Sequence, residues 1–459
     1  MTLEPSSVHS RVAIAFGDDT LEPAPTWVGL DAAYPNLVTS YQIDRGRQWE
    51  LDRTDTGRAT VEIADVDGVL DPTNAGSPYV GQIEPLKQVM LSRRNPVDGN
   101  WYVRYRGFVE EYQYEFHPSQ RVNMLTLSLV DLFEILAAIE MQPWAADGTG
   151  FGDDPVTAGV PQSAGQVFFD SDAFDERINK VLDQSHIPVE FRSVFSGNVL
   201  LWGGPPYSPG ESALTAIQDA ADAEFVGVSN IYTDRFGRLA AHGREAKFDP
   251  GGVLSGLTDP DLWLWHTWNA GDAAALDGAT AHLRRFSVNR GMTRIINTAK
   301  CTPVANPDAK QLTPAEDAAQ LVKDTASIGH YGIRSWSAEN LLTLQGQIGI
   351  TDCLAETRRF ASYYVGNYAS PANRITDIQF RSMRLGQPGA IVTWNLLCKV
   401  DISDEIFVTV GSPGGGGIDH AQYYVEGVHE TAQPLNPDMD DVTVTLDLSP
   451  FPQTVDPWA

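Results

Sequence analysis

The segment Val122-Asn123-Met124-Leu125-Thr126-Leu127-Ser128-Leu129 places leucine at every second position from residue 125 onward, with hydroxyl side chains between the leucines. A period of two is typical of a β-strand that buries one face and leaves the other in water. Residues 101–109 also have the composition of a strand, and His117-Pro118-Ser119-Gln120 between the two has the composition of a turn. We therefore expect a β-hairpin here.

A further strand is indicated upstream, where Thr60-Val61-Glu62-Ile63 alternates polar and apolar residues. Residues 65–72 then have turn chemistry, because aspartate bonds nearby amides, glycine allows positive φ and proline ends a strand. Asp65-Val66-Asp67-Gly68 also loosely resembles the start of a calcium loop, but the third ligand and the bidentate glutamate are missing at the required spacing. A β-turn is the favoured interpretation.

The hydrophobic period changes from two to three or four after residue 130, which predicts helices. Asp131 stands at the N-cap position of the first helix. A second helix is expected from about Asp175, and a third from Ser208-Pro209-Gly210-Glu211, with the serine as its cap. A β-hairpin around Asp234-Arg235-Phe236-Gly237 should follow, so this part of the chain reads as a mixed α/β region.

Strand patterns resume at residue 284, with one helix expected near residues 351–366. The strands expected beyond that helix are residues 375–380, 390–397, 405–410, 423–429 and 442–448. Gly414-Gly415-Gly416-Gly417 lies between two of these strands and is interpreted as a hairpin tip, because no Lys-Ser/Thr follows it as in a phosphate-binding loop.

The chain has 459 residues, with 60 acidic and 32 basic side chains and a formal net charge of −28. Proteins that grip nucleic acid need clustered lysine and arginine, so this balance argues against such a role. It does not argue against a protein past which DNA slides, because an acidic wall repels phosphate, and simple solubility is the alternative interpretation. The length predicts about two to four domains.

No run of ~18 apolar residues is present, so no segment is expected to span a membrane. The N-terminus Met1-Thr2-Leu3-Glu4-Pro5-Ser6 lacks the basic and apolar regions of a secretory signal, which predicts synthesis and retention in a cytosol. Cys301, Cys353 and Cys398 are far apart and have no metal-type spacing, so we expect buried free thiols.

No catalytic, cofactor-binding or metal-binding residues are predicted, since G-x-S-x-G and H-E-x-x-H are absent and the nine histidines are scattered. The aromatic group Trp263, Trp265 and Trp268, with His266 among them, is harder to dismiss. Its first two members would share one strand face. Packing in a core or an interface is the favoured interpretation, and a carbohydrate-stacking platform is the alternative.

Several segments, taken in order, resemble hub-type minor tail proteins of siphophages, especially those that infect actinobacteria. Examples are Arg106-Gly107-Phe108-Val109-Glu110 and Tyr423-Tyr424-Val425-Glu426-Gly427-Val428. The full set consists of residues 58–63, 67–74, 77–79, 85–89, 106–110, 213–224, 232–239, 331–335, 423–428 and 443–448. The resemblance extends over most of the chain, with these segments in the order found in that family.

The resemblance implies a mainly β fold with α+β insertions. It implies an N-terminal β-barrel-like hub domain at residues 1–136, a mixed α/β inserted region at residues 137–283, and a C-terminal β-barrel-like hub domain at residues 284–459 with a helical insertion around residues 350–368. Hubs of this family are homotrimers in which two such domains per subunit form a pseudo-sixfold ring that continues the tail tube.

The same resemblance implies a structural role at the virion tail tip, after synthesis and assembly in the host bacterial cytoplasm. The implied partners are the distal tail protein, the tape-measure protein and other tail-tip proteins. DNA would pass through the ring during ejection without being specifically bound, and no cofactor is implied.

Some hubs of this family append a peptidase or lysin domain, but here Pro457-Trp458-Ala459 directly follows the last expected strand, so we expect no enzyme. Three alternatives stay open. The first is a sixfold distal tail ring protein, the second is a carbohydrate-binding host-adhesion module that uses the tryptophan group, and the third is an enzyme such as a glycosidase with two separated carboxylates.

Overall fold

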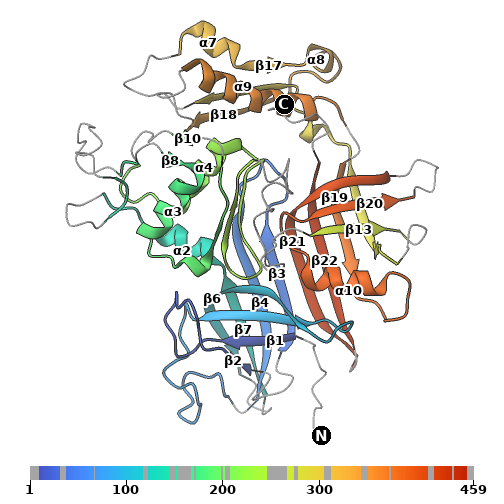
Figure 1. Ribbon diagram of the computed structural model, residues 1–459. Coiled ribbons are helices and arrows are strands. Elements are labelled where there is room, and N and C mark those ends of the chain that lie inside the picture. Colours follow the sequence, from blue (N-terminus) through green and yellow to red (C-terminus); the bar gives the residue numbers. More distant parts are fainter. Residues whose placement is uncertain are drawn as a thin grey trace.

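The computed structural model describes residues 10–30, 38–66, 68–116, 122–143, 150–153, 167–169, 172–197, 200–201, 207–244, 266–272, 278–303, 312–342, 350–371, 374–411, 418–436 and 439–451. Two strand-rich modules, one from each half of the chain, form most of the molecule (Figure 1). A helical region lies beside the N-terminal module, and a small α/β unit lies at the opposite end of the molecule from β1 and β2.

The N-terminal module is an antiparallel sheet with the strand order β3-β4-β7-β6-β5-β1-β2. Its strands are β1 (Ser10–Ile14), β2 (Val28–Gly29), β3 (Val38–Gly46), β4 (Asp55–Val66), β5 (Gln88–Arg94), β6 (Trp101–Glu115) and β7 (Val122–Val130). The expected hairpin is confirmed as β6 and β7, and Leu125, Leu127 and Leu129 are all buried. Its turn, residues 117–120, lies outside the described residues.

The aspartate-rich turn after β4 also forms as predicted. Asp65 is buried, and its carboxylate accepts a hydrogen bond from the amide of Leu70 at 3.2 Å. The side-chain amide of Asn74 donates to the carbonyl of Gly68 at 2.8 Å. These bonds use polar side chains to fix the path of the backbone.

The C-terminal module has the strand order β14-β13-β20-β21-β22-β19-β15. Its strands are β13 (Thr267–Gly271), β14 (Ala281–His282), β15 (Arg285–Asn289), β19 (Arg374–Arg381), β20 (Glu405–Val410), β21 (Ile418–Asn436) and β22 (Met439–Pro450). Neighbours are antiparallel except that β13 runs parallel to both β14 and β20. Four of the strands expected in this part are therefore confirmed as β19 to β22.

The strand expected at residues 390–397 is wrong, because these residues form the helix α10 (Ala390–Lys399). The run Ile391-Val392-Thr393 is β-branched, which favours a strand when only local preference is considered. Burial follows a different period. The buried positions Ala390, Thr393, Trp394 and Leu397 have the spacing of one helix face, whereas Ile391 is 58% exposed.

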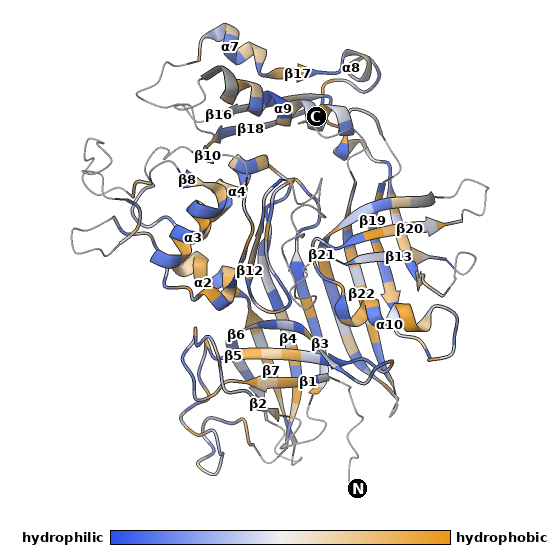
Figure 2. Cartoon of the chain, viewed as in Figure 1, coloured by the Kyte–Doolittle hydropathy of each residue, from blue (hydrophilic) through white to orange (hydrophobic). Residues whose placement is uncertain are grey.

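Both modules belong to one sheet, because β3 pairs with β21. Their buried side chains also form one hydrophobic cluster, and Figure 2 shows hydrophobic and hydrophilic residues alternating along the strands. Within the described part of the chain, β2, β14 and β15 each pair on one side only. The mainly β class with α+β insertions is thus confirmed, and the sheet is open rather than closed into barrels.

The helical region contains α2 (Leu132–Ala138), α3 (Phe174–Gln184) and α4 (Ala213–Phe225). The shorter elements here are β8 (Asp172–Ala173), η1 (Val189–Phe191), β9 (Arg192–Val194), β10 (Leu200–Leu201), β11 (Asn230–Thr233) and β12 (Leu239–His242). Asp131 caps α2 as predicted, since its carboxylate accepts the amide of Phe133 at 2.9 Å. The hairpin β11–β12 is also confirmed.

The predicted start of the third helix is wrong. The helix α4 begins at Ala213, and its cap is Ser212, whose hydroxyl accepts the amide of Thr215 at 3.2 Å. Gly210 has a φ of +92°, which no helical residue adopts, so the chain cannot run as a helix from Ser208. Ser208 and Glu211 instead close a separate turn through reciprocal hydrogen bonds.

The α/β unit is inserted between β15 and β19. It contains η3 (Met292–Arg294), β16 (Thr298–Pro303), α7 (Pro314–Ala319), β17 (Leu321–Lys323), α8 (Thr325–Tyr331), β18 (Ser335–Leu341) and α9 (Ile350–Tyr368). The predicted helix near residues 351–366 is confirmed as α9, and its inward residues Cys353, Leu354, Phe360, Ala361 and Tyr364 are buried. The helices α7 and α8 were not predicted, although Thr313-Pro314-Ala315-Glu316 carries the capping-box pattern that begins α7.

Two further expectations from the sequence bear on the interior and on membranes. All three cysteines are buried and free, as predicted. Among the helices of the described residues, none combines the length and apolar character needed to cross a membrane.

Candidate functional site

The two modules meet where β3 runs antiparallel to β21, with Asp44 opposite His429 and Gly46 opposite Gly427. The backbones approach closely at this point. A Cβ atom on Gly46 would lie 2.3 Å from the carbonyl oxygen of Glu426, and the φ of +91° also requires glycine. The main chain therefore fixes the register of the junction before any side chain contributes.

A buried group of charged and polar side chains crosses the junction, and we call Tyr41, Arg93, Arg104 and Glu430 the Glu430 cluster. The Glu430 carboxylate accepts hydrogen bonds from Arg104 Nε at 2.9 Å and from the Tyr41 hydroxyl at 2.7 Å. Arg93 also donates to this carboxylate. All four side chains are at most 3% exposed. Glu430 lies on β21 and its partners on β3, β5 and β6, so the cluster connects the two modules.

The two arginines of this cluster also reach the C-terminal end of α10. Arg93 donates to the carbonyl of Leu397 at 2.8 Å, and Arg104 donates to the carbonyl of Val400 at 3.0 Å. Carbonyl groups at a helix C-terminus lack partners within the helix and favour cations. Burial, and after it the charge of Arg93, lower the pKa of Arg104 to about 9, which leaves its guanidinium charged at neutral pH.

A second buried pair brings the helical region into the junction. Arg45 Nη2 lies 2.8 Å from Asp401 Oδ1, and Arg45 also donates to the carbonyl of Thr233 at 3.1 Å. The amide of Arg235 donates to Asp401 Oδ2 at 2.9 Å. Burial acts to raise the pKa of Asp401, but Arg45 and Arg235 outweigh it and hold that pKa below its ordinary value. This carboxylate thus ties β3, the β11–β12 turn and the segment after α10 together.

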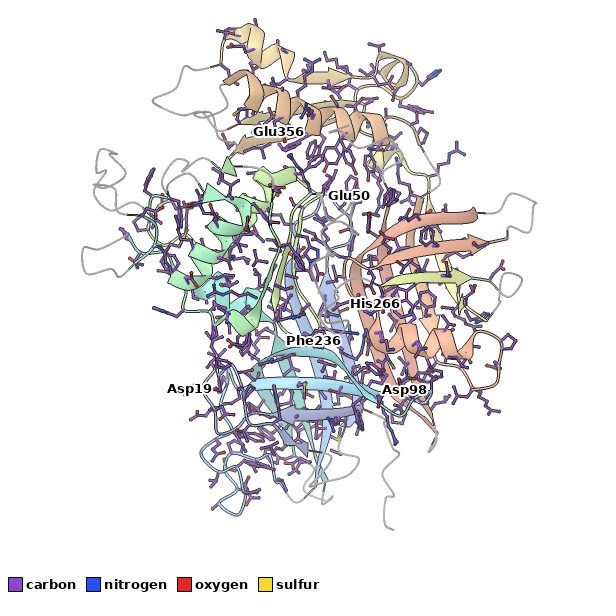
Figure 3. The ribbon with its side chains drawn as sticks, viewed as in Figure 1. Asp19, Glu50, Asp98, Phe236, His266 and Glu356 are labelled. Atoms are coloured by element: carbon purple, nitrogen blue, oxygen red, sulfur yellow. The ribbon has the colours of Figure 1, made fainter. Side chains whose placement is uncertain are left out.

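Two further contacts extend the junction toward the α/β unit. Arg47 Nε lies 2.8 Å from Glu426 Oε2, and Arg47 also donates to the carbonyl of Gly227 at 3.0 Å. Glu50 accepts a hydrogen bond from the hydroxyl of Tyr368 on α9. Figure 3 shows Glu50 just below the α/β unit, between the helical region and the C-terminal module. Four parts of the chain therefore meet around β3.

His429 lies at the solvent-facing side of the junction. Its Nδ1 is 2.8 Å from Asp44 Oδ1 on β3, and its Nε2 is 2.9 Å from Asp447 Oδ2 on β22. Hydrogen bonds to these two carboxylates raise the pKa of His429 to about 9, so at neutral pH the ring is protonated and donates to both. The ring borders an open depression of about 410 Å³ that Arg47 and Arg53 also line.

The arrangement can hold several parts of the chain in one relative orientation. A rotation of one module against the other would leave buried guanidinium and carboxylate groups without partners, which is strongly unfavourable. Within the described ranges, no group of three or more His, Cys, Asp or Glu residues is placed to hold a metal ion. Because its buried charges pair with one another across the modules, we interpret the junction as a structural site.

The tryptophan group singled out from the sequence is only partly described. Trp268 lies on β13, is 8% exposed, and donates its indole N–H to Asp404 Oδ2 at 2.8 Å. The amide of His266 donates to the other oxygen of that carboxylate at 2.7 Å. Trp263, Trp265 and the glycine run at residues 414–417 lie outside the described residues.

The junction residues were not predicted from the sequence. Glu430 lies between Val428 and Ala432 on the buried face of β21, where a charged residue interrupts an apolar alternation. That interruption is the feature that could have identified it, because a charge on a buried face must have a partner. The partners Arg93 and Arg104 come from strands more than 300 residues earlier, and nothing in the local sequence identifies them.

Comparison with known proteins gives a fold class but no family. No protein-family model matches the sequence, and no curated protein matches it. Among solved structures, the chain shares its fold with a tail protein, and the similarity extends over nearly the full length of both chains.

That structure is the tail protein from Neisseria meningitidis MC58, with a TM-score of 0.52 at 11% identity and 96% of each chain covered. The 43 kDa tail protein of prophage MuSo2 from Shewanella oneidensis gives a TM-score of 0.48 at 10% identity, with 96% of this chain and 98% of that chain covered. The prophage tail protein gp18 from Listeria monocytogenes EGD-e gives 0.43 at 8% identity, with 98% and 96% covered. At these identities the similarity concerns the fold.

Proposed function

We propose that this chain is a structural protein of a phage tail and forms a homotrimeric hub at the tail tip. The observation that carries the proposal is the full-length similarity in fold to the Neisseria tail protein, at a TM-score of 0.52. The ordered segments that resemble hub-type minor tail proteins support the same role, in a siphophage of an actinobacterial host.

The arrangement of the modules suits a component of a ring. Residues 1–136 and 284–459 would supply two tube-forming domains per subunit, with β13 and β14 added to the second, and the rest of residues 137–283 would lie outside the tube. Sheet edges at β2, β14 and β15 pair on one side only within the described residues. Neighbouring copies would cover such edges, since exposed edges otherwise invite uncontrolled pairing.

The hub would link the tail tube and the distal tail protein to the tape-measure protein and to tip or receptor-binding proteins. DNA would pass through the ring during ejection without specific binding, and the net charge of −28 favours such passage because acidic walls repel phosphate. The proposal includes no cofactor and no turnover of substrate. The protein would be assembled in the host bacterial cytoplasm and reside at the virion tail tip.

The number of copies per assembly tests the proposal. The chain has a mass of 50.1 kDa, so light scattering or mass photometry of the full chain distinguishes one, three and six copies. We expect three copies in solution and threefold symmetry in averaged images of tail tips. Six copies would favour the distal-ring alternative, and a monomer that degrades cell-wall polymer would favour the enzyme.

A further inference from the structure

The edge of the C-terminal module carries a basic segment in a strongly acidic protein. Residues 283–294 read Leu-Arg-Arg-Phe-Ser-Val-Asn-Arg-Gly-Met-Thr-Arg and contain four arginines and no carboxylate, although the chain as a whole has a net charge of −28. The segment spans β15 and η3. We call it the β15 edge.

Three of the four arginines at this edge are exposed. Arg284, Arg285 and Arg290 are exposed, and within the described residues none of them forms an ion pair with a carboxylate. Among the described residues, the Arg285 guanidinium donates to the hydroxyl of Ser287 at 3.5 Å, and that hydroxyl donates to Asp377 on the neighbouring strand at 3.1 Å. The positive charge of the edge is therefore available to a binding partner.

The backbone of β15 is also available. It pairs with β19 on one side, and no described strand pairs with it on the other. Large apolar side chains surround the arginines: Phe286 is 38% exposed, Val288 43%, Met292 62% and Ile333 68%. Ile333 belongs to the same surface, because its neighbour Arg334 lies 3.4 Å from the sulfur of Met292.

Charged residues on an edge strand can also serve to prevent pairing, and the bulge between Ser287 and Val288 fits that interpretation. A strand protected in this way would not expose Phe286, Val288 and Met292 beside the charges. Arginine, methionine and aromatic residues together are instead the composition enriched at protein interfaces.

We infer that the β15 edge is an intersubunit surface that docks on the acidic N-terminal module of a second copy of this chain. The inference rests on the proposed function, because a closed ring needs two different complementary surfaces on opposite sides of each subunit. The connection between β1 and β2 supplies the second surface. It carries Asp18, Asp19 and Glu22 and lies next to the open edge at β2.

The two surfaces lie on different sides of the molecule. Asp19 lies at the lower left in Figure 3, whereas β19, the neighbour of β15, lies at the upper right in the same view (Figure 1). A contact between them within one subunit is therefore excluded by their separation. A contact between copies places positive charge against negative charge and covers two open sheet edges at once.

The test compares oligomeric state across charge variants of the full chain. R285E/R290E places two carboxylates at the β15 edge, and R285Q/R290Q removes the charges without reversing them. K323E on β17 is the matched control, because Lys323 is an exposed cation away from the edge. We expect wild type and K323E to form trimers. We expect R285E/R290E to reach the same fraction of trimer only at a roughly tenfold or greater protein concentration than wild type. For any variant that is found as a monomer, a cooperative thermal unfolding curve shows that the chain is still folded.

Charge reversal on the other surface identifies the partner. D19R/E22R should weaken the trimer in the same way. The variant that combines D19R/E22R with R285E/R290E should form the trimer again, because opposite charges then face each other. A trimer that persists in R285E/R290E overturns the inference and leaves the hub proposal standing. A wild-type monomer overturns both.

Nucleic acid is the competing occupant of an arginine-rich edge. Titration of the wild-type chain with duplex DNA at 0.15 M salt should show no saturable binding that depends on Arg285 and Arg290. Binding that R285E/R290E abolishes, with the trimer unchanged, would assign the edge to phosphate and overturn the inference.

Discussion

A single carboxylate, that of Glu430, balances two guanidinium groups in the interior of the molecule. Arg93 and Arg104 both donate to it, and all three side chains are at most 1% exposed. A buried ion pair often adds little over well-packed apolar residues, yet removal of one partner is costly because the other charge stays buried. The junction is therefore more sensitive to losing Glu430 than its net contribution to stability indicates.

We expect Glu430→Gln to lower the free energy of unfolding by about 3–5 kcal/mol, because two arginines would then lack their counter-charge. Urea denaturation followed by tryptophan fluorescence measures this loss. Glu111→Gln is the control, since Glu111 is exposed on β6 and its change should stay within about 0.5 kcal/mol. Equal effects of the two substitutions would contradict the role of the Glu430 cluster.

His429 gives the junction a pH dependence with a defined sign. The folded-state pKa is about 9, above the roughly 6.5 of an unfolded histidine. Its contribution to stability is thus complete below pH 6.5 and is lost as the pH rises through 9. The ring is 38% exposed, so solvent screening limits the contribution to about 1 kcal/mol.

The stability difference between wild type and His429→Gln should accordingly be largest near pH 6 and shrink toward pH 10. Denaturant titrations at several pH values measure it. His330→Gln is the control, because His330 is exposed on α8 and forms no ion pair with a carboxylate among the described residues. A difference that grows above pH 8 would show that the carboxylates Asp44 and Asp447 do not hold the protonated ring.

At the scale of elements, periodicity alone predicted much of the structure. The hairpin β6–β7, the helix α9 and the strand β22 all formed where one face is apolar and the other polar. The failures have a common physical cause. The helix α10 and the start of α4 depend on which residues the surrounding fold buries and on the φ of one glycine, and neither is visible in local preference.

The junction could not be predicted from the sequence, for a similar reason. Glu430 and its arginine partners are more than 300 residues apart, so their pairing exists only after both modules have folded. When only the local sequence is considered, an arginine in a strand is expected on the solvent-exposed face of the sheet. Only the apolar neighbours of Glu430 in β21 indicated that a charged residue is buried there, and they did not identify the residues that pair with it.

Substitutions in α10 test whether these residues form the observed helix or the strand that local preference favours. Ile391→Lys should change stability by less than about 0.5 kcal/mol, because this side chain points to solvent in the helix. Trp394→Ala should cost about 3–5 kcal/mol, since its ring is buried and its N–H donates to the carbonyl of Met383. A strand would bury residues 391, 393, 395 and 397 together, so a large cost for Ile391→Lys would contradict the helix.

At the scale of the whole molecule, the two modules share a strand ladder, a hydrophobic cluster and a buried charge network. Independent domains normally have separate cores and interfaces that allow relative motion. Here β3, the end strand of the N-terminal module, pairs with residues 427–432 of β21, which lies within the C-terminal module. In the proposed hub, this rigidity would hold the two tube-forming domains of a subunit in one relative orientation.

The shared core predicts that the modules unfold as one unit. Native-state hydrogen exchange should give the same opening free energy for the amides of β4 in the N-terminal module and of β22 in the C-terminal module. Glu430→Gln should lower both values together, because the broken contact belongs to both modules. The α/β unit packs in a hydrophobic cluster that is separate from that of the sheet and includes Phe225 and Val228 of the helical region, so β16 and α9 serve as the internal comparison and are expected to open at lower free energy. If β4 and β22 opened at clearly different free energies in wild type, the chain would contain two hinged domains, and a rigid hub built on the β3–β21 ladder would no longer be tenable.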